Sequence, residues 1–159
     1  AYRKWDARQD YIVNWENDGY EIKNNRNSSG KVRSHNYNGK FALKEGLTWT
    51  SLSSGKFSAR YSPIGYMFDS KGAMGFSRNN SDIEPLLGLL NSKIADSYLK
   101  FFSPTLDFKV GDIILIPNKL PSFEKNSYIK QIVQDTVSLS HESFKYHETN
   151  WDFPKHPLV

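Results

Sequence analysis

The stretch from Gly46 to Gly72, GLTWTSLSSGKFSARYSPIGYMFDSKG, constrains the fold more than any other part of the 159-residue chain. Short runs in it alternate apolar and polar residues, and Ser-Gly and Pro-Ile-Gly interrupt these runs. Such alternation predicts strands with one buried face, and the interruptions predict tight turns between them. We therefore expect antiparallel hairpins, the last of them closed by Ala73 to Phe76. The mixture of aromatic rings, hydroxyl groups and cations is also typical of a surface that binds a polyanion.

The composition is that of a single globular domain with many aromatic side chains. Hydrophobic residues make up 38% and charged residues 24%, so the chain is long and apolar enough to bury a core. The 14% of aromatic residues argues against a disordered chain. The net charge of +4 is compatible with nucleic acid as a partner, and equally with an ordinary basic soluble domain.

The chain contains no cysteine, which excludes a disulfide framework, a zinc ribbon and thiol catalysis. This fits a reducing compartment, and we expect a cytoplasmic location. The first ten residues, AYRKWDARQD, are too charged for a signal peptide, and no apolar run approaches a membrane span, so no membrane partner is expected. Because the chain begins without Met and in mid-pattern, we also expect it to be a fragment of a longer protein.

The N-terminal part is expected to hold a hairpin followed by a long basic loop. Tyr11 to Trp15 is predicted to be a strand, and Asn17-Asp18-Gly19 a turn before Tyr20 to Ile22 resumes it. The next segment, Lys23 to Lys40 (KNNRNSSGKVRSHNYNGK), has too little apolar content to fold by itself. We expect a loop there that is either functional or disordered.

Residues 82–102 are predicted to form one amphipathic helix, because their apolar side chains recur at spacings of three and four. Ser81 and Glu84 fit a capping box at its start, and Pro85 lies in the first turn, where it is tolerated. The expected apolar face consists of Ile83, Leu86, Leu87, Leu90, Ile94, Tyr98 and Phe101.

Two further elements and an irregular tail complete the expected fold. Ile113 to Ile116 predicts a buried strand, and Ser122 to about Lys145 a second amphipathic helix. The tail, His147 to Val159, is expected to be irregular and packed. Together these elements predict a single α+β domain over residues 1–159, with N-terminal antiparallel hairpins in a mixed sheet packed against two longer amphipathic helices.

Common enzyme motifs are missing from the sequence. There is no G-x-G-x-x-G, no G-x-x-x-x-G-K-[ST] and no G-x-S-x-G. The histidines are not spaced as metal ligands, so we expect no metal, no cofactor and no catalytic residue in this chain. One weak alternative stays open, because Glu21 and Lys23 form an E-x-K on a predicted strand, as in Mg²⁺-dependent nucleases. No upstream Asp is well placed to complete that site.

DNA binding is the function best supported by the loop and the hairpins. Lys and Arg neutralise phosphates, while Arg and Asn can read base edges. We expect base reading by Arg60 or Arg78 and phosphate contacts elsewhere. Arg60 could equally stack on Tyr61 or Trp49, and Asn79 could simply belong to a turn. The predicted DNA-binding residues are Lys31, Arg33, Lys40, Lys56, Arg60, Lys71, Arg78 and Asn79.

Short motifs also occur in a characteristic order along nearly the whole chain. They are Asn14-Trp15-Glu16-Asn17-Asp18-Gly19, Glu21-Ile22-Lys23-Asn24, Gly46-Leu47-Thr48-Trp49, Arg60-Tyr61-Ser62-Pro63, Gly65, Phe68-Asp69, Leu87-Gly88-Leu89-Leu90-Asn91-Ser92-Lys93, Pro104-Thr105-Leu106, Phe108, Val110-Gly111-Asp112-Ile113, Pro117, Glu148-Thr149, Trp151-Asp152-Phe153 and His156-Pro157-Leu158. This set resembles the C-terminal target-recognition region of the PglX-type adenine methyltransferases of BREX phage-resistance systems, and of related fused restriction–modification enzymes.

The resemblance implies DNA recognition without catalysis in these 159 residues. In that family a Rossmann-type methyltransferase precedes this region and flips its adenine into a separate pocket. Its Asn/Asp-Pro-Pro-Tyr/Phe motif and Gly-rich AdoMet loop do not occur here, so AdoMet is expected only in the absent catalytic domain. The resemblance implies a mixed α/β region with hairpins that face DNA, and a scaffold role for Leu90-Asn91-Ser92-Lys93. Within Gly46 to Gly72 it implies that Gly46-Leu47-Thr48-Trp49 and Tyr61-Ser62-Pro63 are structural.

Three functional hypotheses follow for the chain. The first is sequence-specific recognition of duplex DNA, which positions a target adenine for an upstream AdoMet-dependent methyltransferase domain of the same chain. The second is a protein-docking module that contacts other phage-defence subunits through its aromatic residues. The third is the Mg²⁺-dependent nuclease with Glu21 and Lys23.

Overall fold

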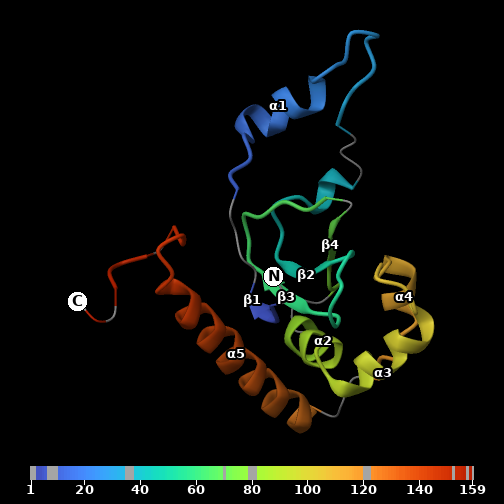
Figure 1. The fold of residues 1–159 in the computed structure, drawn as a ribbon, viewed down its shortest axis with the longest axis vertical. Coiled ribbons are helices and arrows are strands. Elements are labelled where there is room, and N and C mark those ends of the chain that lie inside the picture. Colours follow the sequence, from blue (N-terminus) through green and yellow to red (C-terminus); the bar gives the residue numbers. More distant parts are fainter. Residues whose placement is uncertain are drawn as a thin grey trace.

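The computed structural model describes residues 3–6, 11–34, 38–69, 71–78, 82–119, 123–151, 153–156 and 158, with the backbone alone at 123–125. A mixed four-stranded sheet lies at its centre (Figure 1), in the order β1-β3-β2-β4. The strands are β1 (Trp5–Asp6), β2 (Gly46–Thr50), β3 (Ala59–Ser62) and β4 (Gly72–Gly75). One α-helix, α1 (Glu16–Asn24), lies between β1 and β2, and the other α-helices of the described residues follow β4, so strands and helices are largely segregated along the chain and the predicted α+β class is confirmed.

Of the hairpins predicted between Gly46 and Phe76, the one formed by β2 and β3 is present, and the last one, closed by Ala73 to Phe76, is wrong. β2 pairs antiparallel with β3, as expected from the alternation in this stretch. β4 pairs antiparallel with β2 instead of with the strand that precedes it, so β2 occupies an inner position. β1 pairs parallel with β3 at the other edge, and its two residues are too few for a sequence pattern to predict.

The two faces of the sheet differ in chemistry. The pairing register places Leu47, Trp49 and Ala59 on one face, and all three are buried in the hydrophobic core. Trp49 is therefore a core residue, and its indole Nε1 donates to the Phe108 carbonyl at 3.2 Å. Side chains of alternate residues point to the opposite face. That face carries Thr48, Thr50 and Arg60, none of which is buried.

The expected continuous helix over residues 82–102 is wrong, because the helix is interrupted at Asn91 and Ser92. The structure has two helices instead, α2 (Ile83–Leu90) and α3 (Lys93–Phe102). Ser92 caps α3, since its Oγ accepts from the amide of Ala95 at 3.2 Å. The buried Asn91 amide group bonds to β3, where Oδ1 accepts from the Ala59 N–H and Nδ2 donates to the Ala59 carbonyl, both at 3.0 Å. The scaffold role expected for this motif is confirmed.

The break changes which side of α3 is buried. α3 buries Ala95 and Leu99. Part of the predicted apolar face lies in solvent instead, with Ile94 61% and Phe101 81% exposed and Tyr98 also exposed. The predicted face is correct only for α2, which buries Ile83, Leu87 and Leu90.

The start of α2 also differs from the expected capping box. Asp82 is the N-cap residue and makes no side-chain cap bond, while Ser81 lies outside the described residues. The Glu84 carboxylate accepts instead from Gln134 Nε2 at 2.9 Å, which joins α2 to α5.

The predicted buried strand Ile113 to Ile116 is wrong. Val110–Ile114 forms a short helix, α4, and only Ile116 of the predicted strand is buried. The Asp112 carboxylate accepts from the backbone N–H of Lys109 at 3.2 Å, a helix-start contact that overrides the β-propensity of the isoleucines.

The second predicted helix is confirmed as α5 (Phe123–Lys145), which packs against α2 and β1. The tail is irregular as expected, but Trp151 is exposed, so the expected packing is wrong at that residue. Within the described ranges, no helix is long and apolar enough to cross a membrane.

Replacing Asn91 should destabilise the fold. Asn91→Ala leaves the Ala59 N–H and carbonyl without their partners in a buried site, which should lower the free energy of unfolding by about 3 kcal/mol. Urea denaturation measures this. The control is Ser97→Ala on α3, which removes only an exposed bond to the Lys93 carbonyl. Equal effects of the two variants would contradict the proposed importance of Asn91.

Candidate nucleic-acid interface

Residues 11–34 form an arm that stands away from the sheet (Figure 1). The predicted hairpin is wrong here, since 11–15 is irregular and Glu16–Asn24 is assigned as helix α1. The turn signal itself is correct. Asn17, Asp18 and Gly19 all have left-handed backbone angles, with φ of 50°, 57° and 70°. The turn therefore leads into a helical segment rather than into a second strand.

Contacts within the arm explain this conformation. A Cβ at Gly19 would lie 2.7 Å from the Trp15 ring, so the backbone approaches the indole as only glycine allows. Lys23 Nζ lies 5.2 Å from the centroid of the same ring and 2.6 Å from the Asp18 carboxylate. Glu21 accepts from Asn14 Nδ2 at 2.8 Å. The arm root is thus a small self-packed unit.

These contacts also bear on the nuclease hypothesis. Glu21 and Lys23 lie on α1 and not on a strand, so the predicted strand that would carry the E-x-K motif is wrong. Two residues apart on a helix, the side chains point away from each other. Each is bonded to another residue of the arm. Among the described residues, no three His, Asp or Glu gather as a metal ligand set.

The loop predicted from Lys23 to Lys40 is confirmed for residues 25–34, while Lys23 and Asn24 end α1 and Gly39 and Lys40 belong to a short 3-10 helix. The tip of this loop is ordered around Asn27. The Asn27 Oδ1 accepts from the backbone amides of Ser29 and Lys31, at 3.1 and 2.9 Å. A single bridge joins Arg26 to Val32. Lys31 and Arg33 are both exposed on this tip.

The outer part of the arm and its return to the sheet form a run without negative charge. From Ile22 to Lys44 the sequence has no Asp or Glu, while its cations are Lys23, Arg26, Lys31, Arg33, Lys40 and Lys44. Lys23, Arg26 and Lys44 were not among the predicted DNA-binding residues, although the absence of Asp and Glu from this run could have indicated them. Such a run produces a positive potential that attracts phosphates.

An aromatic cluster anchors the return of the arm to the body. Phe41, the last residue of the short 3-10 helix η1 (Gly39–Phe41), stacks on Phe76 with ring centroids 4.9 Å apart. Phe68 meets Phe76 edge-on at 5.5 Å. Lys40 and Lys44 place their ammonium groups 5.2 and 5.6 Å from the Phe41 centroid. Lys40, which was predicted to bind DNA, therefore lies beside this cluster at the root of the arm.

Arg60 lies on the open face of the sheet. Its Nη2 donates to Thr50 Oγ1 at 2.8 Å, and it forms no ion pair with a carboxylate of the described part. Desolvation lowers the pKa of Arg60, and the nearby charge of Arg3 lowers it further. The expected stacking on Tyr61 or Trp49 is wrong, because both rings belong to the other face. A partly desolvated guanidinium without a carboxylate is suited to an incoming phosphate or base edge.

The other predicted residues lie at the two ends of the sheet. Lys56 and Lys71 are exposed in the segments next to Thr50, one after β2 and one before β4. Arg78 is exposed after β4, at the end where Lys40 and the arm are found. Asn79 lies outside the described residues. The structure therefore places cations at both ends of the sheet, with Arg60 on the open face between them.

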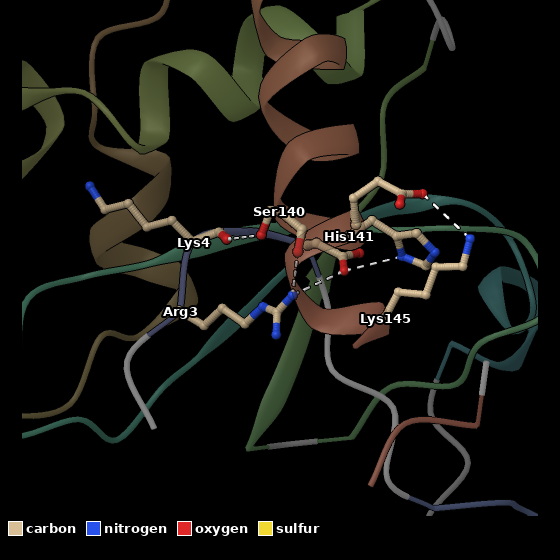
Figure 2. Close-up of polar contacts among 7 residues, drawn as sticks. Arg3, Lys4, Ser140, His141 and Lys145 are labelled. Carbon is tan, nitrogen blue, oxygen red and sulfur yellow. Dashed lines mark hydrogen bonds and ion pairs between the residues drawn. The ribbon is translucent and has the colours of Figure 1, made fainter. Parts of the chain in front are cut away.

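A separate polar seam joins β1 to α5, and Figure 2 shows its contacts. Arg3 Nη2 donates to the Ser140 carbonyl at 2.8 Å. Asp6 Oδ2 lies 3.4 Å from both the Arg3 guanidinium and His141 Nδ1. A cavity of about 290 Å³ beside the seam is lined by residues that include Asp6, Tyr61 and His141.

The chemistry of this cavity does not suit an anion. The Tyr61 hydroxyl donates to the Glu45 carboxylate at 2.9 Å. Burial, together with that bond, raises the pKa of Tyr61 to about 12. With Asp6 and Glu142 in its lining, the cavity repels phosphate. We assign the seam a structural role, since it holds the edge strand β1 in place.

Comparison with known proteins agrees with the resemblance found in the motifs. No family model matches the chain. The chain is 39% identical over 160 residues to the adenine-specific methyltransferase PglX of Lacticaseibacillus casei (strain Zhang), which includes 100% of the chain and 13% of that protein. It is 33% identical over 159 residues to the adenine-specific methyltransferase BrxX of Escherichia coli O9:H4 (strain HS), with 99% and 12% covered. The chain is similar throughout to one region of PglX and BrxX. It spans only a small part of their length.

Several motifs that carry the resemblance have structural roles in this chain. Trp15 and Gly19 shape the arm root, and Asn91 joins α2 to the sheet. Leu47, Trp49 and Ser62 are buried. The motifs at these positions are therefore framework, as expected for Gly46 to Trp49 and Tyr61 to Pro63. The exposed cations of the arm tip lie between them in the chain.

The arm root offers a test of its rigidity. Gly19→Ala combines a positive φ with a clash against Trp15, so it should destabilise the arm locally by about 1–3 kcal/mol. Amide hydrogen exchange over residues 14–24 should accelerate, while the melting temperature changes little. Gly30→Ala is the matched control, because Gly30 has φ of +79° but open space around it. Equal exchange in the two variants would show that the Trp15 contact does not hold the arm.

Proposed function

We propose that the chain is the DNA-recognition region of a longer adenine-specific methyltransferase of a phage-defence system. It positions duplex DNA while a catalytic domain elsewhere in the polypeptide, which binds AdoMet, methylates a target adenine. The observation that carries the proposal is the basic run from Ile22 to Lys44, which has no Asp or Glu and includes the tip of the arm that stands away from the body of the molecule (Figure 1). The names of the relatives support the methyltransferase context.

The arm tip has the chemistry of a groove-contacting element. Its side chains are almost all Asn, Ser, Lys and Arg, which bond to phosphates and to base edges. The tip is kept in shape by its own backbone bonds, so exposed Lys31 and Arg33 remain available to DNA. Basic arms of this kind bind in a groove while the folded body contacts the backbone.

The open sheet face supplies a second contact. Arg60 lies opposite Thr48 on β2, whose hydroxyl donates to the Ala73 carbonyl, and Thr50 Oγ1 accepts from the Arg60 guanidinium. Thr50 therefore orients Arg60, and the other guanidinium N–H groups can donate to phosphate oxygens. Cations at both ends of the sheet extend this face. DNA that lies over the face would meet Arg60 near its middle, and the arm would reach the adjacent groove.

Removing the cations of the tip tests the contribution of the arm. The double variant Lys31→Ala, Arg33→Ala should bind duplex DNA more weakly and should reduce the slope of log affinity against log salt by about 2. Fluorescence anisotropy over a salt series measures both. The matched control is Lys119→Ala, Lys155→Ala, which removes two exposed cations outside the arm. An equal loss of DNA affinity in both double variants would contradict a specific role of the arm tip and would indicate only a general effect of net charge.

Arg60 tests the contribution of the sheet face. Arg60→Ala should lower DNA affinity about tenfold and lower stability by no more than about 1 kcal/mol, because it loses one bond to Thr50. Thr50→Val removes the same bond but keeps the guanidinium, so it should retain DNA binding. A large loss of stability in Arg60→Ala would show that the residue is structural.

One observation favours the protein-docking hypothesis as a second function. Apolar side chains of α3 and α4 are exposed on a part of the molecule away from the arm (Figure 1). Recognition of DNA and docking of protein therefore use different surfaces and are compatible.

A further inference from the structure

A groove with apolar walls lies between the sheet edge and α4. Its volume is about 320 Å³. Strand β4 and the residue after it form one wall, and α2 and α4 form the others. The lining includes Met74, Phe76, Leu86, Val110, Ile113 and Ile114. We call this site the apolar groove. A groove of this size accommodates one or two bulky apolar side chains of another segment.

The rim of the apolar groove exposes large apolar side chains to solvent. Ile114 is 75% exposed, and Val110 and Leu115 are also exposed. α3 packs next to α4 and adds the stripe of Ile94, Tyr98 and Phe101. The residues of this stripe repeat with the helical period that normally indicates a buried face. An exposed stripe with this period, next to a groove, is typical of a surface that another protein segment covers.

The edge strand β4 strengthens this interpretation. In the sheet order β4 is terminal. On its outer side Gly72 is bonded to Asp69 through both its N–H and its carbonyl, so Met74 is the residue of β4 whose outward backbone groups a further strand could meet. Such an edge next to apolar pockets is a common way to bind an extended segment. Both backbone and side-chain recognition are therefore available at the groove.

The charge of this surface points to protein rather than DNA. The segment from Lys93 to Lys119 has four lysines, counting these two, and three carboxylates that nearly balance them: Asp96, Asp107 and Asp112. Lys100 pairs with Asp96 at 2.9 Å. The run from Ile22 to Lys44 has six cations and no carboxylate, so it has no such balance. An apolar and nearly neutral surface gains little from phosphates and much from the burial of apolar side chains.

We infer that the apolar groove is the docking site for the methyltransferase portion of the same polypeptide; this rests on the proposed function in that the chain is part of a longer enzyme. The chain matches only 13% and 12% of PglX and BrxX, so most of a protein of that kind lies outside the region described. A segment tethered to the chain is present at an effective concentration near the millimolar range, so a modest apolar groove is enough to hold it. Docking there would fix the distance between the arm and the catalytic pocket.

Amide hydrogen exchange on the full-length enzyme and on the 159-residue chain tests this inference. Amides of residues 93–116 should exchange about tenfold more slowly in the full-length enzyme, because the interface must open first. Exchange at the arm tip, residues 26–33, should be the same in both. The double variant Phe101→Glu, Ile114→Glu should abolish the difference. The matched control is Tyr128→Glu, Leu139→Glu on α5, whose side chains are both 71% exposed.

Each outcome decides the inference. Protection that the groove variant removes and the α5 variant retains supports it. Equal exchange in the two proteins overturns it. Protection in the 159-residue chain that grows with concentration, together with a doubled mass in light scattering, also overturns it, since a second copy would then occupy the groove. DNA binding by the arm is measured separately with the Lys31 and Arg33 variant, so either proposal can fail while the other stands.

Discussion

The bond pair between the Asn91 side chain and the Ala59 backbone determines how the helices lie on the sheet. A side-chain amide there takes the place of a strand residue, donating to a carbonyl and accepting from an N–H. The helix cannot continue through Asn91, so α2 ends and Ser92 begins α3. The Asn91 carbonyl also accepts from Lys4 Nζ at 2.9 Å, which connects the edge strand β1 to the same point. One residue thus joins the sheet, both helices and the N-terminal strand.

The helix break has a consequence for the surface. Because α3 starts anew, it buries the small Ala95 and the adjacent Leu99 and leaves Ile94 and Phe101 outside. The same sequence in one continuous helix was expected to bury them. The exposed apolar surface of α3 therefore results from the helix interruption at Asn91 and Ser92. It lies on another part of the molecule from the basic arm (Figure 1). Two chemically distinct surfaces follow from one core.

The sequence predicted the elements whose pattern is local and repeated. The β2–β3 hairpin follows from alternation with turn signals, and α5 follows from its helical period. The prediction from sequence failed where a single tertiary or capping contact determines the local structure. These contacts are the packing of Trp15 on Gly19 in the arm, the bonds of Asn91 to Ala59, and the bond of Asp112 at the start of α4. For the candidate site the sequence identified exposed cations such as Lys31 and Arg33. Their separation into an arm, an open face and two sheet ends depends on strand order, which no local pattern contains.

Under the proposed function, the arm accounts for the alternation of proposed DNA contacts and framework residues along the chain. A basic tip by itself would bind DNA with little control of orientation, since phosphate attraction is not directional. Orientation requires a root that resists bending. The Trp15 and Gly19 contact stiffens one side of the root, and the Phe41, Phe68 and Phe76 rings fix the returning side to the body. Because the tip has few apolar contacts of its own, its shape depends on the Asn27 bonds and on the root that holds it.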